Sequence, residues 1–297
     1  IVYATGKIPI WYHPPLLHYH DSIRGICMKK ENTNKELLII IPAYNEEASI
    51  SGFLSKLLAD ESHTYADILV INDASTDNTL SIVQELNIPV ISHPYNLGYG
   101  TALQTGYKYA VINGYQYIIQ IDSDGQHDVC NIQRIYELLT SKEKPDLVIG
   151  SRFLKGSQSF PISLTKKIAI AFFSIVIRLT SRQKITDPTS GLQGLNRKVF
   201  GYYARFGNFD NSYPDANMLV QMTLLGYRVQ ECPAIMHRRE AGKSMHFGII
   251  EPILYMFIMV FSTLNVFIRH KWHLLAKPTT LPEKTENVKP TKGGIKH

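Results

Sequence analysis

The chain has 297 residues, 44% of them hydrophobic and 19% charged, which is typical of a globular protein with a sizeable core. Its net charge of +6 is compatible with nucleic acid, an anionic membrane surface or phosphate-bearing substrates as partners. The three scattered cysteines, Cys27, Cys130 and Cys232, exclude a disulfide framework and a CxxC metal site, and they favour a reducing compartment.

The first segment, residues 1–27, has neither a starting Met nor the pattern of a signal peptide. Met28, followed by two lysines, resembles a natural start. We therefore expect residues 1–36 to be an N-terminal extension, derived from upstream translation or an added segment, and we assign it no function.

Buried strands and amphipathic helices are predicted to alternate from Leu37 to Phe153. Continuous apolar runs ending in polar residues indicate parallel strands, and apolar residues at helical spacing follow them. The predicted strands are 37–42, 66–72, 88–92, 115–121 and 146–151, and the predicted helices are 46–60, 75–86, 98–114 and 130–140. This alternation predicts an α/β fold with a mostly parallel sheet.

The second half of the chain reads differently. Residues 163–184 are strongly apolar with basic residues near their ends, and residues 185–200 form a turn-rich stretch before another helix. A helix and then a strand are predicted within residues 213–234. The tail, residues 276–297, is rich in Pro, Lys and Thr, which predicts disorder.

Polar residues follow three of the predicted strands at the point where each strand ends. These groups are Pro42 to Glu46, Asn72 with Asp73, and Asp122 to Asp124. An aspartate at one strand end is usually a turn former or a helix cap. Three such ends in one alternating sheet predict a single ligand-binding crevice, because open α/β sheets bind ligands beyond the carboxyl ends of their strands.

The D-x-D pair, Asp122 and Asp124, brackets a predicted bend, so both carboxylates can approach one hard cation. Gln126 could add a carbonyl oxygen. Taken alone, the pair is equally compatible with two turn-forming aspartates, and His127 and Asp128 are expected to belong to a turn or a helix cap.

Seven segments occur in an order that resembles a known family: IIPAYNEEASI, VINDASTDNT, NLGYGTALQTGY, IDSDGQHD, GSRF, DPTSGLQG and RREAGKS. Over residues 37–248 the chain resembles the family 2 nucleotide-sugar glycosyltransferases, and within them the dolichyl- or polyprenyl-phosphate mannose synthase-like branch. The resemblance implies a GT-A fold, Rossmann-like with flanking helices, and a nucleotide-diphosphate sugar as donor.

The resemblance also implies roles for individual residues. Those matching the nucleotide-binding positions are Pro42, Tyr44, Glu46, Asp73 and Asp122. The residues matching the ligands of a divalent cation, Mg²⁺ or Mn²⁺, are Asp122, Asp124 and Gln126.

Three basic residues match positions that face phosphate in the family. They are Arg152 and Arg239, which we take as catalytic residues, and Lys243, which with Arg239 would bind the acceptor phosphate. An arginine suits this task because its planar fork donates two parallel hydrogen bonds. Arg238 and Arg239 could also be a solvated basic turn.

Asp215 is a candidate catalytic base. A hydroxyl acceptor needs a carboxylate to take its proton, whereas a polyprenyl phosphate is already ionised and needs none. Asp215 follows Pro214 and precedes an apolar helix, so a helix N-cap explains it equally well.

Two apolar segments suggest membrane attachment. Residues 253–268 carry no charge but fall short of the roughly 20 residues that cross a bilayer, so a helix over 249–275 could lie in the plane as well as span. Residues 163–184 are predicted to form interfacial helices or, alternatively, a buried core helix. Because the basic residues cluster beside apolar stretches rather than exposed aromatics, we expect a membrane partner and no nucleic acid.

The sequence therefore predicts an inverting, metal-dependent hexosyltransferase at the cytoplasmic face of the cell membrane, acting in cell-envelope glycan synthesis. Its acceptor is expected to be polyprenyl phosphate or another lipid-linked molecule, with a glycan hydroxyl as the alternative. A small membrane subunit or a second copy of the chain are further candidate partners. A non-catalytic nucleotide-sugar or glycan-binding module is the rival of another class, and the base and sugar of the donor stay open.

Overall fold

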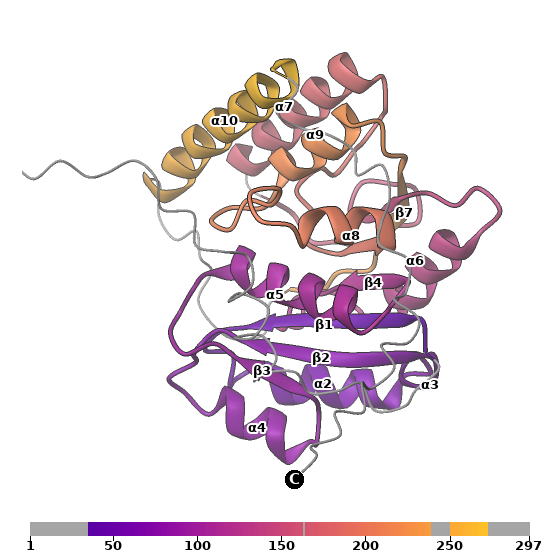
Figure 1. The fold of residues 1–297 in the computed structure, drawn as a ribbon, viewed down its shortest axis with the longest axis vertical. Helices are drawn as coiled ribbons and strands as arrows, with labels where there is room; N and C mark the ends of the chain where they lie inside the picture. The colour runs from indigo at the N-terminus through magenta and orange to yellow at the C-terminus, as the bar shows by residue number, and fades with distance from the viewer. Residues whose placement is uncertain (1–34, 163, 239–249, 273–297) are drawn as a thin grey trace, which may run out of the picture. The chain divides into compact units, whose positions relative to one another are not determined.

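The structure, a computed structural model, describes residues 35–162, 164–238 and 250–272. Within these ranges a seven-stranded sheet has the order β3-β2-β1-β4-β6-β5-β7 (Figure 1). The strands are β1 (Leu37–Ala43), β2 (Ala66–Asn72), β3 (Val90–Ser92), β4 (Tyr117–Gln120), β5 (Leu147–Ser151), β6 (Gln193–Asn196) and β7 (Val229–Pro233). The helices are α2 (Ile50–Ala59), α3 (Ser62–Tyr65), α4 (Thr79–Glu85), α5 (Tyr99–Ile112), α6 (Cys130–Thr140), α7 (Leu164–Ser181), α8 (Arg197–Tyr203), α9 (Ala216–Leu224) and α10 (Ile250–Lys271).

The predicted α/β class and mostly parallel sheet are confirmed. β1 pairs in parallel with both β2 and β4, β2 with β3, and β5 with β7, while β6 runs antiparallel to β4 and β5. The three strands β2, β1 and β4 are fully or mostly buried apolar runs, as expected for strands covered by helices on both faces.

The prediction for residues 185–200 was incomplete, because this turn-rich stretch contains the interior strand β6. β6 is only four residues long, and its second residue is Gly194, which carries no strand signal. A Cβ atom on Gly194 would lie 2.2 Å from Ile135 and 2.8 Å from Leu139. Tight packing of α6 on the sheet thus favours glycine at this position. A β-branched residue, which would indicate a strand in the sequence, does not fit there.

Two apolar clusters cover the two faces of the sheet. On one face α2, α4 and α6 pack against β1, β2 and β4 through residues such as Leu54, Val83 and Ile135. On the other face α5, α8 and α9 pack through residues such as Leu103 and Phe200. The sheet is thereby buried on both sides, and its strand ends are the part left open to ligands.

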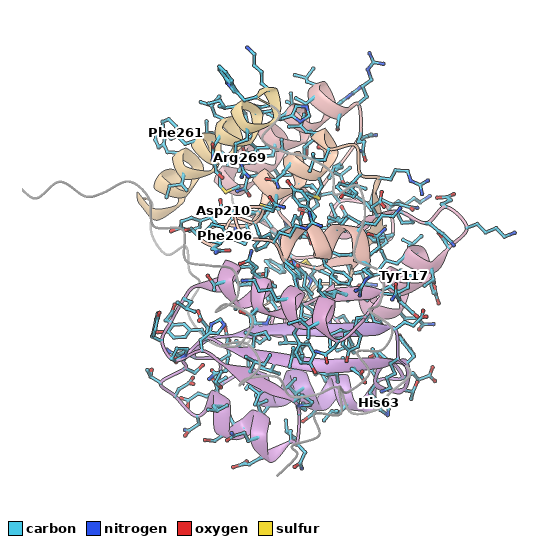
Figure 2. The ribbon with its side chains drawn as sticks, viewed as in Figure 1. His63, Tyr117, Phe206, Asp210, Phe261 and Arg269 are labelled. Atoms are coloured by element: carbon cyan, nitrogen blue, oxygen red, sulfur yellow. The ribbon has the colours of Figure 1, made fainter. Side chains whose placement is uncertain are left out.

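α7, α9 and α10 lie together beyond the second face of the sheet (Figure 1), and both α7 and α10 contact α9. α7 buries one side, including Phe173 and Ile177, and exposes the other. Figure 2 labels Phe261 on the outer side of α10, where it is 67% exposed. None of the helices within the described ranges has the length and apolarity needed to cross a bilayer.

Candidate active site

The carboxyl ends of β1, β2 and β4 meet at one edge of the sheet. Asp73, directly after β2, donates its backbone N–H to the carbonyl of Ala43 at 2.9 Å. Ser123, between the two aspartates of the D-x-D pair, donates its hydroxyl to the carbonyl of Pro42 at 3.0 Å. These bonds place the three polar strand ends side by side, where open α/β sheets bind ligands.

The residues after β1 form the first wall of this edge. Pro42 is buried within the strand, whereas Tyr44 is 45% exposed and Glu46 is partly exposed. The side chain of Asn45 accepts a hydrogen bond from the backbone N–H of Thr76 at 2.8 Å, which joins the loop after β1 to the loop after β2. Pro42 is thus buried, Tyr44 is exposed, and the partly exposed Glu46 accepts a hydrogen bond from the Ser49 hydroxyl at 2.7 Å. Their contacts with a nucleotide stay predictions.

Asp73 is a buried anchor for the loop before α5. Its carboxylate accepts hydrogen bonds from His93 Nδ1 at 2.7 Å and from the backbone N–H groups of Leu97 at 2.9 Å and Gly98 at 2.8 Å. The other ring nitrogen of His93 contacts the Thr105 hydroxyl at 2.9 Å. Both oxygens of Asp73 therefore have protein partners, and its contact with a nucleotide base stays a prediction.

Asp122 is partly exposed and is held from several directions. The Tyr99 hydroxyl donates to Asp122 Oδ1 at 3.0 Å, and His127 Nε2 lies 3.8 Å from Oδ2. A Cβ atom on Gly191 would lie 2.8 Å from Oδ2, so a larger residue at this position would displace the carboxylate. Burial raises the pKa of Tyr99 well above its ordinary value, and the charges of Asp122 and Asp215 act in the same direction. The phenol therefore stays protonated and serves as a donor.

Asp124 and Gln126 complete the D-x-D turn. The backbone N–H of Gln126 donates to Asp124 Oδ1 at 3.0 Å, and Gly125 between them has a φ of +72°. Asp122, Asp124 and Gln126 are all partly exposed. Among the described residues, no three His, Cys, Asp or Glu side chains are placed to hold a metal ion together. Asp122, Asp124 and Gln126 offer oxygen donors, the type of ligand that a hard cation such as Mg²⁺ or Mn²⁺ would take.

Asp124 also lines a cavity of about 430 Å³ between α2 and the D-x-D turn. The wall is mixed: it includes the polar residues Ser49, Lys56, Asp60 and His237 and the apolar residue Phe53. Asp124 thus lies at the border of a cavity large enough for a small ligand.

Asp128, which the sequence places in a turn or a helix cap, joins the D-x-D turn to the segment that follows β7. Its carboxylate accepts a hydrogen bond from the backbone N–H of Cys130 at 2.9 Å and contacts His237 Nε2 at 2.8 Å. Its own N–H donates to the carbonyl of Ile235 at 3.1 Å. Although burial acts to raise it, hydrogen bonds from Cys130 and His237 lower the pKa of Asp128 to about 2. The turn at Asp128 is thus fixed to His237, which lies 109 residues further along the chain.

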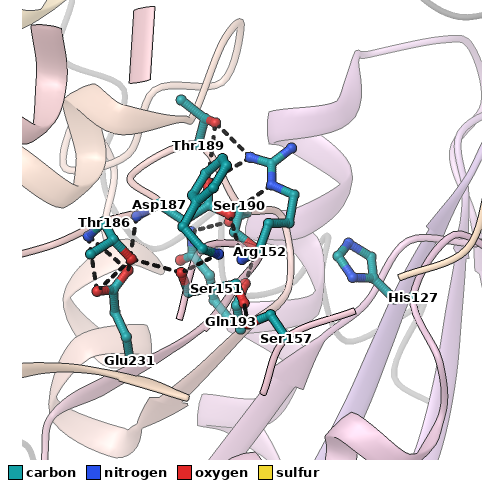
Figure 3. Close-up of polar contacts among 12 residues, drawn as sticks. His127, Ser151, Arg152, Ser157, Thr186, Asp187, Thr189, Ser190, Gln193 and Glu231 are labelled. Atoms are coloured by element: carbon teal, nitrogen blue, oxygen red, sulfur yellow. Dashed lines mark hydrogen bonds and ion pairs between the residues drawn. The ribbon is translucent and has the colours of Figure 1, made fainter. Parts of the chain in front are cut away.

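Arg152 is part of a buried ion pair (Figure 3). Its guanidinium donates Nε–H to one carboxylate oxygen of Asp187 at 2.6 Å and a terminal N–H to the other at 2.5 Å, and it also contacts Thr189 at 2.9 Å. Glu231 on β7 accepts hydrogen bonds from the backbone N–H groups of Thr186 at 2.9 Å and Asp187 at 2.8 Å. The arginine fork thus supports the 186–189 loop, and its predicted contact with phosphate stays a prediction.

Asp215 occupies the N-cap position of α9, but its side chain makes no capping hydrogen bond. Instead, the side-chain oxygen of Asn217 accepts the backbone N–H groups of Asp215 and Met218, each at 2.9 Å. The two phosphate-binding candidates Arg239 and Lys243 lie outside the described residues.

Solved structures share this fold. The crystal structure of glucosyl-3-phosphoglycerate synthase from Mycobacterium tuberculosis with Mn²⁺, UDP and phosphoglyceric acid aligns with a TM-score of 0.54 and 15% identity. The alignment covers 80% of this chain and 78% of that one. At this identity, the match establishes the α/β GT-A-like fold.

Several relatives match in sequence. A UDP-N-acetylglucosamine–dolichyl-phosphate N-acetylglucosaminyltransferase of Methanococcus voltae is 30% identical over 56% of this chain and 71% of the relative. An undecaprenyl-phosphate mannosyltransferase of Micrococcus luteus is 27% identical over 71% of this chain and 88% of the relative. The family model described as glycosyl transferase family 2 matches residues 38–203, more than half of the chain. The protein therefore belongs to glycosyl transferase family 2, and it is a glycosyltransferase.

Proposed function

We propose that this glycosyltransferase moves a sugar, with inversion, from a nucleotide-diphosphate sugar to a polyprenyl phosphate or another lipid-linked acceptor. An acceptor phosphate oxygen would form the new bond to the anomeric carbon, and the nucleoside diphosphate would leave with the electrons of the broken bond. The reaction would take place at the cytoplasmic face of the cell membrane, in cell-envelope glycan synthesis.

The observation that carries the choice of acceptor is a pair of exposed apolar stripes on α7 and α10. Apart from the adjacent Val260 and Phe261, their residues recur every three or four positions, so each set lines one side of its helix. The stripe residues are Leu164, Ile168, Phe172, Ile175 and Leu179 on α7, and Phe257, Val260, Phe261, Leu264, Ile268 and Trp272 on α10. Exposed basic residues, including Lys167, Arg178 and Lys271, accompany the stripes. Apolar stripes with basic residues beside them are typical of helices that lie in the interface of an anionic membrane.

These helices are connected to the candidate site through α9. Both contact α9, which begins directly after Asp215. Asp210, labelled in Figure 2 beneath α10, accepts hydrogen bonds from Asn217 on α9 at 2.8 Å and from Ser262 on α10 at 3.0 Å. A lipid held at the stripes would therefore have its headgroup on the side of the molecule that carries Asp215.

The donor would bind at the shared strand edge. Tyr44, Glu46 and Asp73 are the proposed nucleotide contacts, with Pro42 beneath them. Asp122, Asp124 and Gln126 would hold Mg²⁺ or Mn²⁺. When bound, such an ion supplies positive charge that stabilises the departing diphosphate. We also retain Arg152, Arg239 and Lys243 as candidates for phosphate binding, with Arg239 and Lys243 on the acceptor.

The domain boundaries proposed from the sequence follow the same division. Residues 37–248 would form the transferase domain, residues 249–275 the membrane-associated helix and residues 276–297 the tail. A small membrane subunit or a second copy of the chain would be a further partner at the membrane.

Two relatives support this acceptor class, since their names specify dolichyl phosphate and undecaprenyl phosphate as the molecules they modify. The synthase of similar fold was crystallised with Mn²⁺ and UDP, which supports a metal-dependent nucleotide-sugar donor.

The proposal is tested by a two-stage assay on the purified full chain. Thermal unfolding is first measured with UDP-, GDP- and dTDP-sugars, with and without Mn²⁺, because a bound ligand raises the unfolding temperature. The stabilising donor is then supplied, radiolabelled in its sugar, with vesicles containing polyprenyl phosphate. We expect one nucleotide to stabilise only with Mn²⁺ and the label to enter the organic phase in the opposite anomeric configuration. Label that stays with water-soluble glycan would overturn the lipid acceptor.

A glycan hydroxyl is the second candidate acceptor, favoured by the closeness of Asp215 to the D-x-D pair: its charge acts on Tyr99, whose hydroxyl donates to Asp122 at 3.0 Å. With a hydroxyl acceptor, Asp215→Ala should lower the turnover rate by roughly 10²-fold or more, because the base is lost. With a polyprenyl phosphate acceptor, the same change should have little effect. Asp215→Asn is the matched variant, since it keeps the size of the side chain.

A further inference from the structure

The carboxylate of Asp122 is held by residues from two separate parts of the chain. The hydroxyl of Tyr99, the first residue of α5, donates to Oδ1 at 3.0 Å. Gly191, in the loop before β6, also approaches so closely that a Cβ atom there would lie 2.8 Å from Oδ2 and 3.5 Å from the Tyr99 hydroxyl. The orientation of Asp122 is therefore set by contacts made before any ligand binds.

Tyr99 is itself fixed by backbone contacts on both sides. The preceding residue, Gly98, has a φ of +90° and donates its N–H to the buried Asp73 at 2.8 Å. The following residue, Gly100, packs so tightly that a Cβ atom would lie 2.6 Å from the carbonyl oxygens of Asp210 and Asn211. The phenol thus reaches Asp122 from a rigid helix start.

We propose that Tyr99 is a positioning residue for the divalent cation, holding Asp122 in the orientation that binds the metal. The inference rests on the proposed function, in which Asp122 and Asp124 hold that cation. Carboxylate ligands are commonly oriented by hydrogen bonds from neighbouring groups, and loss of such a partner costs about 10- to 100-fold in metal affinity or activity. A free Asp122 side chain would instead have to be ordered by the metal itself.

The test is Tyr99→Phe, which removes the hydroxyl and keeps the ring. Binding of Mn²⁺ is followed by the decrease in the electron paramagnetic resonance signal of the free ion, in the presence of UDP, GDP and dTDP in separate measurements. We expect the Mn²⁺ concentration at half-saturation to rise by about 10-fold or more. We also expect excess Mn²⁺ to restore the transfer rate, which a loss of structure would not allow.

Tyr107→Phe is the matched control. Tyr107 lies on the same helix and donates its hydroxyl to Gln120, two residues before Asp122. This variant loses a buried hydrogen bond of the same kind, so it should unfold at a lower temperature and bind Mn²⁺ as the wild type does. Gly191→Ala would place a methyl group against Asp122 Oδ2, close to the Tyr99 hydroxyl, and should raise the Mn²⁺ requirement as Tyr99→Phe does.

The possible results distinguish a failure of the role proposed for Tyr99 from a failure of the metal site itself. If the wild type binds Mn²⁺, Asp124→Asn does not, and Tyr99→Phe matches the wild type, the role of Tyr99 is wrong and the metal site stands. If Tyr99→Phe and Tyr107→Phe shift Mn²⁺ binding equally, the effect is structural and the inference is also overturned. If the wild type itself binds no Mn²⁺ with any of the three nucleotides, both the metal site and the role of Tyr99 are wrong.

Discussion

The region from β1 to α6 and the region from β5 to α10 use different physical means to build one enzyme. In the first region the loops at the strand ends satisfy one another's polar groups, as where Glu47 accepts the backbone N–H of Asn78 at 3.0 Å. In the second region Arg152 and Asp187 are buried as an ion pair, while Phe261 and Leu179 stay exposed. A rigid polar edge suits a soluble, charged donor. Helices with exposed apolar sides would suit the lipid-linked acceptor that we propose.

The largest effect is expected from Asp124→Asn in the first region. This variant should lose the metal ion, and with it most of the transfer activity, while its fold stays intact. Loss of the metal would remove several kcal/mol of stabilisation from the departing diphosphate, or about 10³-fold in rate. The transfer rate measures the loss, and an unchanged unfolding temperature confirms the fold. Full activity of the variant with added Mn²⁺ would show that the D-x-D assignment is wrong.

Arg152→Met tests whether the second region depends on its buried ion pair. The change leaves the carboxylate of Asp187, which is fully buried, without its cation, and such losses cost about 3–5 kcal/mol. Urea unfolding measures the change in free energy. The double variant Arg152→Met with Asp187→Asn should recover much of the stability, because the uncompensated charge is gone. A single variant as stable as the wild type would exclude a structural role for the pair.

Phe261→Ser and Leu179→Ser test the exposed stripes. Burying one such side chain in a membrane contributes about 1.5–3 kcal/mol, so each variant should partition roughly 10- to 100-fold less onto vesicles containing anionic lipid. Co-sedimentation measures this, and unfolding temperatures should not fall. Tyr95→Ser, at a 65% exposed position in the first region, is the control. If all three variants lose vesicle binding equally, membrane contact is not specific to the second region.

Asp77→Asn tests the hydrogen bonds between the loops that follow β1 and β2, and it should have the smallest effect on stability. The carboxylate accepts the backbone N–H groups of Glu47 and Thr79, each at 3.0 Å. Although burial acts to raise it, hydrogen bonds from Thr79 and Glu47 lower the pKa of Asp77. The folded pKa is thus below the unfolded value of about 4, so this contribution to stability is complete above about pH 4 and is lost at lower pH. Urea unfolding should therefore separate variant and wild type at neutral pH and bring them together in acid.

The sequence predicted the first region in more detail than the second. Each strand there is a continuous apolar run, and each polar group lies directly after its strand, so local pattern and final place agree. β6 escaped prediction because Gly194 is chosen by contact with α6. The partner of Arg152 escaped as well, since Asp187 lies 35 residues away and nothing in the GSRF segment indicates it. Asp128 and His237 are 109 residues apart, which hides their contact in the same way.

What the sequence determined by itself is the α/β class, the family and the set of strand-end carboxylates, because period, composition and order of motifs are local properties of the chain. Only the tertiary structure decided how those carboxylates are held. The IDSDGQHD segment names Asp122, but the hydroxyl that orients it comes from α5, and the glycine that leaves room for it comes from the loop before β6. Such contacts depend on which strands become neighbours, and strand order is a property of the packed sheet.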